Sequence, residues 1–398
     1  VHVRVLVASA PREALGCVGA PGGPGRQDLT ALAGSLSDSD AAVHWQVATA
    51  ALGTVASAWP ADAADLLAPA VAHPLWQVRM DAAAVAGRLG DLEAVQVLVR
   101  DPDHNVREAA LRALSSLIGP AGDPEYLAAL DSRDPQLVMT ASRLLEGTSA
   151  GAEALPELLR SLAWFTDFGG ETSRDVRLAL LERIGQLGGM ESADQVDGMA
   201  ERIGPLVEDL DPAVAAAAAD LLTAWTGHPV RPRPSSAFRV ARVPAPGVLA
   251  GYARSRIVFE MEDGGRFVVV TAPFLAPGNA HRLMTQALSG VLEGLTFHRI
   301  APNFVVQGLS PGANEYRGHG GFTRDELGIP SNIRGSVGLS TRGRDSGDGQ
   351  IYVNLVDNLR LDHNYTVFGT VVEGMEVVDG LTPGAVVATV TVEGPAAN

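Results

Sequence analysis

Lysine is absent from this chain, and all 30 of its basic residues are Arg. Together with abundant Ala, Gly, Val and Pro, this indicates a GC-rich genome rather than a functional preference for Arg. The single cysteine, Cys17, excludes an intrachain disulfide and any cysteine-rich metal site, and we predict neither a metal nor a cofactor. No apolar run approaches the roughly 18 residues of a membrane span, so we expect a soluble protein without one.

The chain is long enough for two or three domains, and its charge is distributed unevenly. Residues 1–226 carry 31 acidic and 15 Arg residues, residues 227–246 carry four Arg and no acid, and residues 247–398 carry 15 acidic and 11 Arg residues. An acidic first domain argues against a nucleic-acid partner, because a phosphate backbone would be repelled. It allows a basic protein partner, although solubility alone also accounts for such a surface.

Residues 1–27 form an N-terminal segment with no convincing signal peptide. The apolar stretch at 1–10 is interrupted and too short, and the Ala-Leu-Gly-Cys ending at Cys17 resembles a lipoprotein cleavage box only faintly. The chain does not begin with Met, which indicates a fragment or a processed form. The compartment stays open between cytoplasm and periplasm.

Residues 28–226 repeat themselves. The clearest copies start at Val78-Arg79, Val106-Arg107 and Val176-Arg177, and weaker copies start near His44, Leu137 and Val214. The starts are about 28 to 39 residues apart, a spacing typical of helical-hairpin solenoids. Asp and Pro residues before several copies are helix-start signals. The series resembles HEAT repeats and predicts an all-α solenoid.

The pattern changes after the solenoid. Residues 227–249 carry several prolines and four Arg, so we expect an extended linker whose Arg residues dock on the acidic solenoid. From residue 250 onward, β-rich segments flank a turn at Asp263-Gly264-Gly265, which indicates a hairpin. Residues 277–288 are predicted to form a helix, and Gly-rich loops separate the strands that follow.

The most informative stretch is Phe297–Gly308, which reads FHRIAPNFVVQG. It brings Arg299, Phe304 and Gln307 together within nine residues of a segment rich in β-formers. An aromatic ring can pack on a prolyl ring while Arg and Gln contact the flanking peptide backbone. The stretch is therefore suited to binding a proline and its amide.

Three ordered blocks, FHRIAPNFVVQG, GQIYV and LDHNYTVFGTVVEGMEVVD, resemble the cyclophilin family of peptidyl-prolyl cis-trans isomerases. The resemblance covers about residues 250–396. It implies a multidomain chain in which a HEAT-like solenoid precedes a mostly-β, eight-stranded barrel with capping helices. It also implies isomerase activity toward Xaa-Pro bonds of protein clients, by a bacterial protein that assists protein folding.

The resemblance assigns catalysis to Arg299, Phe304 and Gln307. It implies that eight further residues bind substrate: Val305, Ser340, Thr341, Gln350, Tyr352, Arg360, Leu361 and Tyr365. In ciclosporin-sensitive members a Trp stands at the position of Arg360 and a His at that of Tyr365, so we expect poor sensitivity to the drug. His298, the neighbour of Arg299 on an alternating strand, is predicted to point away from the site as a satisfied structural histidine.

Two other functions stay open at this point. In the first, both domains only bind, and the chain is a non-catalytic proline-binding scaffold. In the second, the solenoid is the functional part, by analogy with HEAT-repeat chromophore lyases, although no chromophore site is visible. The predicted partners are proline-containing protein or peptide clients, together with a protein bound to the acidic solenoid.

Overall fold

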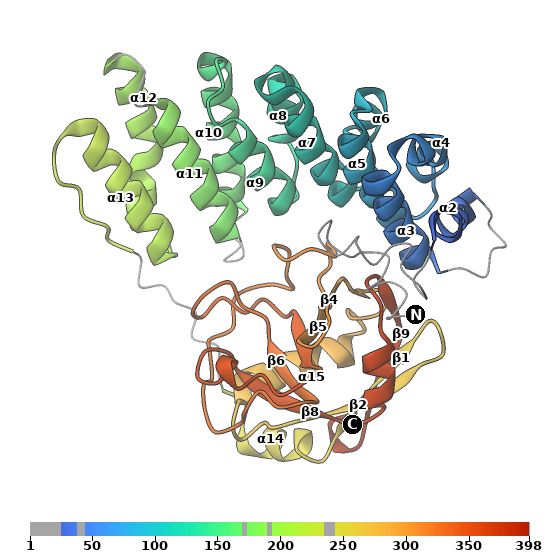
Figure 1. The fold of residues 1–398 in the computed structure, drawn as a ribbon. Coiled ribbons are helices and arrows are strands. Elements are labelled where there is room, and N and C mark those ends of the chain that lie inside the picture. The colour runs from blue at the N-terminus through green and yellow to red at the C-terminus, as the bar shows by residue number, and fades with distance from the viewer. Residues whose placement is uncertain (1–24, 38–43, 169–172, 189–192, 235–242, 398) are drawn as a thin grey trace. The chain divides into compact units, whose positions relative to one another are not determined.

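The computed structural model describes residues 25–37, 44–168, 173–188, 193–234 and 243–397. The expectations for residues 1–24, including Cys17, and for the middle of the Pro/Arg-rich linker lie outside these ranges. The chain forms two compact units that divide between Pro234 and Ser235. The first unit is helical, and the second is built around a β-sheet (Figure 1).

Helices stack side by side in chain order through the first unit, as the prediction of an all-α HEAT-like solenoid requires (Figure 1). They are α2 (Arg26–Gly34), α3 (Trp45–Ala58), α4 (Pro60–Val71), α5 (Trp76–Leu89), α6 (Leu92–Leu98), α7 (His104–Ile118), α8 (Asp123–Ala129), α9 (Pro135–Leu144), α10 (Gly151–Asp167), α11 (Arg174–Gly188), α12 (Ala193–Ile203) and α13 (Pro212–Thr226). Helices α3, α5, α7 and α9 pack on one another in succession, so each buries its apolar face against its neighbours.

The helix starts follow the capping signals in the sequence. Asp103, Asp134 and Asp211 each accept a hydrogen bond from a backbone N–H in the first turn of α7, α9 and α13, respectively. Gly87 of α5 lies so close to α7 that a Cβ atom there would be 2.8 Å from the Cβ atom of Ala113. Small side chains therefore set the close spacing of these two helices.

Buried ion pairs join successive repeats at two places. Arg79 on α5 binds both carboxylate oxygens of Asp101, which precedes α7, at 2.6 and 2.9 Å. Arg177 on α11 pairs with Asp209, which precedes α13, at 2.5 Å. Each Arg follows the Val of a repeat start, so the Val-Arg pair combines a core residue with a link to the next repeat. Just past α13, Arg233 also contacts the solenoid, pairing with Glu208 at 3.0 Å.

The second unit contains a nine-stranded antiparallel sheet in the order β3-β9-β1-β2-β8-β6-β7-β5-β4. The strands are β1 (Arg256–Met261), β2 (Arg266–Thr271), β3 (Thr296–Phe297), β4 (Arg299–Ala301), β5 (Val305–Gly308), β6 (Ser336–Leu339), β7 (Ile351–Asn354), β8 (Val367–Glu373) and β9 (Ala385–Glu393). The first and last strands in this order, β3 and β4, are separated only by His298 and form one extended run. The sheet therefore nearly closes into a barrel. Eight strands were expected, and nine are found because one run is interrupted at His298.

The predicted hairpin is confirmed, since β1 pairs with β2 across the turn at Gly264. The helices of this unit are α14 (Pro246–Tyr252), α15 (Pro277–Ser289) and α16 (Met375–Gly380). Helix α14 begins within the range expected to be linker, and its Leu249 belongs to the barrel core. The hydroxyl of Tyr252 is 2.8 Å from Nδ1 of His281, which joins α14 to α15.

Apolar side chains from strands around the whole barrel fill its interior. Phe259 stacks on Phe267 with ring centroids 4.8 Å apart, and Leu283 and Met284 of α15 pack into the same cluster. Strand residues outside this cluster point outward, where the candidate site is found. Across the ranges described, no helix is long and apolar enough to cross a membrane.

Candidate active site

Four residues form a row across the outer face of the barrel. Arg299 of β4 stands opposite Gln307 of β5, Gln307 stands opposite Tyr352 of β7, and Tyr352 stands opposite Gly338 of β6. Directly opposed residues on neighbouring strands point to the same face of a sheet. The residues that alternate with them, such as Val306 and Val353, lie in the core. The row therefore faces outward.

Arg299 is oriented by its neighbours in this row. Its Nη1 donates a hydrogen bond of 2.9 Å to Oε1 of Gln307, and its Nε lies 3.6 Å from Oε1 of Glu315. Gln307 is buried, so its amide is a fixed acceptor. No partner for Nη2 of Arg299 is found among the residues that the structure describes. The guanidinium is thus held on two sides and keeps one donor free.

Tyr352 is buried opposite Gln307 and is anchored at its hydroxyl, which donates a 2.6 Å hydrogen bond to Oδ1 of Asn332. Its ring covers Gly338, where a Cβ atom would lie 2.2 Å from Cζ of the tyrosine, so only glycine fits there. Tyr365 contacts the same ring edge to face, with centroids 6.1 Å apart. Burial, and to a lesser degree the neighbouring Tyr365 and Asp362, raise the pKa of Tyr352, so its hydroxyl stays protonated.

Phe304 ends the turn that precedes β5 and stands three residues before Gln307. Its carbonyl oxygen accepts hydrogen bonds of 3.0 Å from the backbone N–H of Leu355 and from Nδ2 of Asn358, which fixes the backbone beneath the ring. The guanidinium carbon of Arg360 lies over the ring, 4.6 Å from its centroid. Val305 follows Phe304 and is buried on the outward side of β5.

The remaining predicted residues lie on the segments around this row. The backbone N–H of Ser340 donates a 2.9 Å hydrogen bond to the carbonyl of Gln350, and Thr341 makes no side-chain hydrogen bond among the described residues. Leu361 is half-buried and ends the short 3-10 helix Leu359–Leu361.

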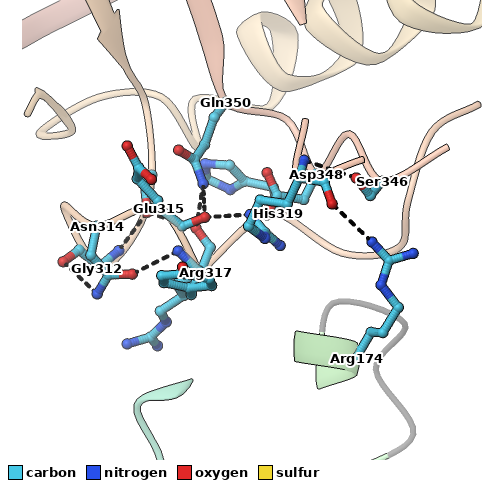
Figure 2. Close-up of polar contacts among 12 residues, drawn as sticks. Arg174, Gly312, Asn314, Glu315, Arg317, His319, Ser346, Asp348 and Gln350 are labelled. Atoms are coloured by element: carbon cyan, nitrogen blue, oxygen red, sulfur yellow. Dashed lines mark hydrogen bonds and ion pairs between the residues drawn. The ribbon is translucent and has the colours of Figure 1, made fainter. Parts of the chain in front are cut away.

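The resemblance places Gln350 beside the catalytic Arg, but its Nε2 instead donates to the carbonyls of Glu315 at 3.1 Å and Arg317 at 3.5 Å (Figure 2). Gln350 therefore reaches Arg299 only through Glu315.

His298 lies beside Arg299 but is buried. Neither ring nitrogen makes a hydrogen bond of ordinary geometry among the described residues, although the backbone of Thr296 interacts with the ring. The histidine is therefore structural, as expected, but its ring nitrogens are poorly satisfied. Burial, reinforced by the charge of Arg299, lowers the pKa of His298 to about 4. The ring is therefore neutral near pH 7 and contributes to packing rather than to the outward row.

Two residues of the site were not identified from the sequence. Glu315 lies in an irregular Gly-rich loop, where no periodicity marks a functional position. Asn332 follows Pro330 in another loop, and its buried side chain bonds Tyr352, Asn354 and Asp362. An Asn near a Pro is ordinarily a turn residue, so the sequence held no signal for this role. Within the described ranges, no group of three or more His, Cys, Asp and Glu side chains is placed to hold a metal ion.

Comparisons with known proteins bear on both units. A family model described as cyclophilin-type peptidyl-prolyl cis-trans isomerase matches residues 256–395, and a model of HEAT repeats matches residues 29–115. Peptidyl-prolyl cis-trans isomerase B of Bacillus subtilis is 33% identical over 138 residues, which are 34% of this chain and 96% of the relative. The chain belongs to the cyclophilin-type peptidyl-prolyl cis-trans isomerases.

Two further peptidyl-prolyl cis-trans isomerases match the chain at a similar level of identity. The peptidyl-prolyl cis-trans isomerase of Helicobacter pylori strain 26695 is 35% identical over 119 residues, which cover 29% of this chain and 73% of the relative. Peptidyl-prolyl cis-trans isomerase A of Dickeya dadantii is 33% identical over 127 residues, covering 27% of this chain and 60% of the relative. Each of these relatives matches about a third of this chain or less, a share comparable to the cyclophilin-type model over residues 256–395.

Proposed function

We propose that the barrel catalyses cis–trans isomerisation of peptide bonds that precede proline, with Arg299 as the principal catalytic group. The observation that carries this proposal is the hydrogen bond from Arg299 to buried Gln307, which fixes the guanidinium on the outer face while Nη2 has no partner in the described ranges. The family to which the chain belongs supports the reaction. The alternative of a non-catalytic scaffold is less favoured, because Arg299, Phe304 and Gln307 are all present and lie together.

The chemistry requires no nucleophile. Amide resonance opposes rotation with a barrier of about 18–20 kcal/mol, and twisting the bond removes that resonance. The nitrogen of proline then becomes pyramidal and basic, so a donor placed beside it stabilises the twisted amide more than either planar form. An Arg suits this role because it stays charged at every relevant pH. Nη2 of Arg299 is the donor that we assign to the prolyl nitrogen.

The proline itself needs an apolar surface next to this donor. Phe304, Val305 and Tyr352 supply aromatic and aliphatic area on the same outward face, and Leu361 and Tyr365 extend it. Ser340 and Thr341 follow β6, and we assign their backbone to pairing with the substrate chain. Gln350 affects Arg299 indirectly, because it fixes the loop that carries Glu315.

We assign client binding to the HEAT-like solenoid. HEAT repeats present extended surfaces that are suited to protein partners. The acidic residues of this half outnumber its Arg residues by 31 to 15, which favours a basic protein surface. The bacterial relatives support a role in bacterial protein folding, in which the solenoid brings a client to the isomerase groove.

An isomerisation assay on a Xaa-Pro peptide with the full chain tests the catalytic proposal. Arg299→Ala should lower kcat/KM by roughly 100-fold or more, as for the loss of a preorganised electrostatic donor. Arg254→Ala, a change of the same kind at an exposed position after α14, should leave the rate unchanged. A folded Arg299→Ala protein within about threefold of wild type would overturn the role of Arg299. Peptide binding without any acceleration by wild type would favour the scaffold instead.

A further inference from the structure

Glu315 is held rigidly although it lies in a loop. Its carbonyl oxygen accepts a hydrogen bond of 3.1 Å from Nε2 of buried Gln350 (Figure 2). It also accepts one from Nη1 of Arg342. One residue earlier, Asn314 is also buried, and its Oδ1 accepts the backbone N–H of Tyr316 at 3.0 Å. The backbone on which Glu315 sits is therefore fixed from both sides.

The carboxylate of Glu315 points to the catalytic guanidinium. Oε1 lies 3.6 Å from Nε of Arg299, and the Glu315 side chain is 48% exposed. No partner for its second oxygen, Oε2, is found among the described residues. The nearby guanidinium of Arg342 is bound at 3.0 Å by the buried carboxylate of Asp348. Glu315 thus presents an acceptor to solvent beside Arg299.

Arg360 provides the opposite charge at a different point. It is exposed and lies over the ring of Phe304, 4.6 Å from the centroid. The described part of the chain offers it no hydrogen bond or ion pair. Its guanidinium is therefore a cation kept beside the proline-binding ring without a carboxylate to neutralise it.

The two charges are separated along β5. Arg299, and with it Glu315, is aligned with Gln307, whereas Arg360 is aligned with Phe304. Phe304 lies in the turn just before β5, three residue steps from Gln307, which is about 10 Å of extended chain. A peptide of three to four extended residues spans the same length. A substrate whose proline sits between these two positions would therefore have one flanking side near Glu315 and the other near Arg360.

We propose that Glu315 and Arg360 are specificity-determining residues that select Xaa-Pro segments with a cationic residue on one side of the proline and an acidic residue on the other, in one order only. This inference rests on the proposed function, because it takes the surface between Arg299 and Phe304 as the place where the proline binds. Each charge pairs with the complementary residue of the correct substrate and repels the residue of the reversed one.

Two peptides of identical composition test the order. Ala-Lys-Ala-Pro-Phe-Glu-Ala and Ala-Glu-Ala-Pro-Phe-Lys-Ala have the same net charge and differ only in which side carries which sign. Exchange spectroscopy by NMR gives kcat/KM for each, and chemical-shift titration gives the Kd. Solvent-exposed ion pairs each change binding by a factor of about 1.5 to 5, so one peptide should be preferred by about fivefold or more at low salt. The preference should shrink at 0.5 M NaCl.

Variants connect the preference to the two residues. Glu315→Gln and Arg360→Gln should each weaken it, and the double charge exchange Glu315→Arg with Arg360→Glu should invert it. Glu262→Gln and Arg254→Gln, which change exposed charges elsewhere on the barrel, should leave it unaltered. Equal kcat/KM and Kd for the two peptides in wild type would overturn the proposal. So would a preference that survives in the double variant.

The neutral peptide Ala-Ala-Ala-Pro-Phe-Ala-Ala separates this inference from the proposed function. If it is isomerised while the two charged peptides behave alike, the charge selection is wrong and the catalytic proposal stands. If it is not isomerised but the charged peptides bind with different Kd, the catalytic proposal fails and the selection stands. A uniform loss of kcat/KM on all three peptides in Glu315→Gln, with the order preference unchanged, would show that Glu315 only positions Arg299.

Discussion

Gln307 binds one terminal nitrogen of Arg299, and the other has no partner among the residues that the structure describes. The bond from Nη1 to Oε1 is 2.9 Å long, and the two residues are opposed in register on β4 and β5. The amide of Gln307 is buried, whereas the guanidinium of Arg299 is partly exposed. Gln307 is therefore the more fixed of the two and orients Arg299. Gln307 is therefore a positioning residue in addition to any contact with substrate.

Gln307→Leu should lower kcat/KM by about tenfold with folding intact, because one charge-assisted hydrogen bond contributes about 1.5–3 kcal/mol and tenfold corresponds to about 1.4 kcal/mol. The loss should be mainly in kcat, since the apolar surface that binds proline is retained. Gln286→Leu, at a buried glutamine of α15, is the matched control and should be as active as wild type. A Gln307→Leu rate within twofold of wild type would show that Arg299 is oriented without it.

Arg360→Trp should increase sensitivity to ciclosporin. In the sensitive members of the family the Trp at this position gives the drug a flat apolar surface and an N–H donor, whereas Arg360 has a charged head that favours water. Loss of a well-packed aromatic contact typically costs a few kcal/mol of binding. Wild type should therefore be active but poorly inhibited, and the variant should be inhibited at lower drug concentration. Titration of the drug against both proteins measures this directly, and identical inhibition curves would refute the placement of Arg360 beside the drug.

His298 should make the barrel sensitive to acid. Its pKa is about 4 in the folded chain and 6.5 when exposed, so the unfolded state binds the extra proton first as pH falls. Stability is complete above about pH 6.5 and is lost as pH falls toward 4, by up to about 3 kcal/mol for a shift of this size. His298→Leu should remove this part of the slope. Urea titrations between pH 4 and 7.5, followed by methyl NMR signals of the barrel core, compare the two slopes, and parallel slopes would contradict the prediction.

Asp81 should have the opposite effect in the solenoid. Burial raises its pKa to about 6, and a hydrogen bond with Thr49 offsets this only in part. The folded state then holds the proton more tightly than the unfolded state, so stability falls as pH rises from about 4 through 6. Asp81→Asn should stabilise the solenoid at pH 7 by about 1–3 kcal/mol and have little effect at pH 4. All five Trp residues lie in the solenoid, so their fluorescence follows its unfolding in urea. Equal effects of the substitution at both pH values would argue against a buried, titrating carboxyl.

The sequence predicted the fold where local signals and periodicity agreed. Helix starts near Asp103 and Asp211 followed from capping chemistry, and the hairpin at Gly264 followed from its turn residues. The split at His298 and the core role of Leu249 depend on packing between distant segments, which no local pattern records. A Pro-rich stretch ordinarily indicates a linker, but in this chain Pro246 occupies the first turn of α14, where proline is tolerated.

The candidate site also contains residues that local sequence signals predict and residues whose positions depend on contacts between distant segments. Arg299 and Gln307 lie eight residues apart on one hairpin, so their meeting follows from strand alternation and a short turn. Tyr352 joins them only through the pairing of β5 with β7, which no local pattern predicts. The resemblance alone had assigned Tyr352 to the site. Glu315 could not be predicted, because its position depends on hydrogen bonds from Gln350 and Arg342 to its carbonyl, and such bonds leave no trace in residue type.

The pairing of β1 with β9 has a topological consequence for how the barrel is attached to other modules. Arg256, at the start of β1, is opposed to Glu393, at the end of β9. The first and last long strands of the barrel are therefore neighbours, and the chain enters and leaves the barrel at the same place. Neither strand belongs to the row that carries Arg299, Gln307 and Tyr352. A different module could thus replace the solenoid, or a further one could follow β9, without altering the register of the catalytic strands. The isomerase barrel can therefore be combined with different modules. The module that brings clients to it can change in evolution without a change in the catalytic residues.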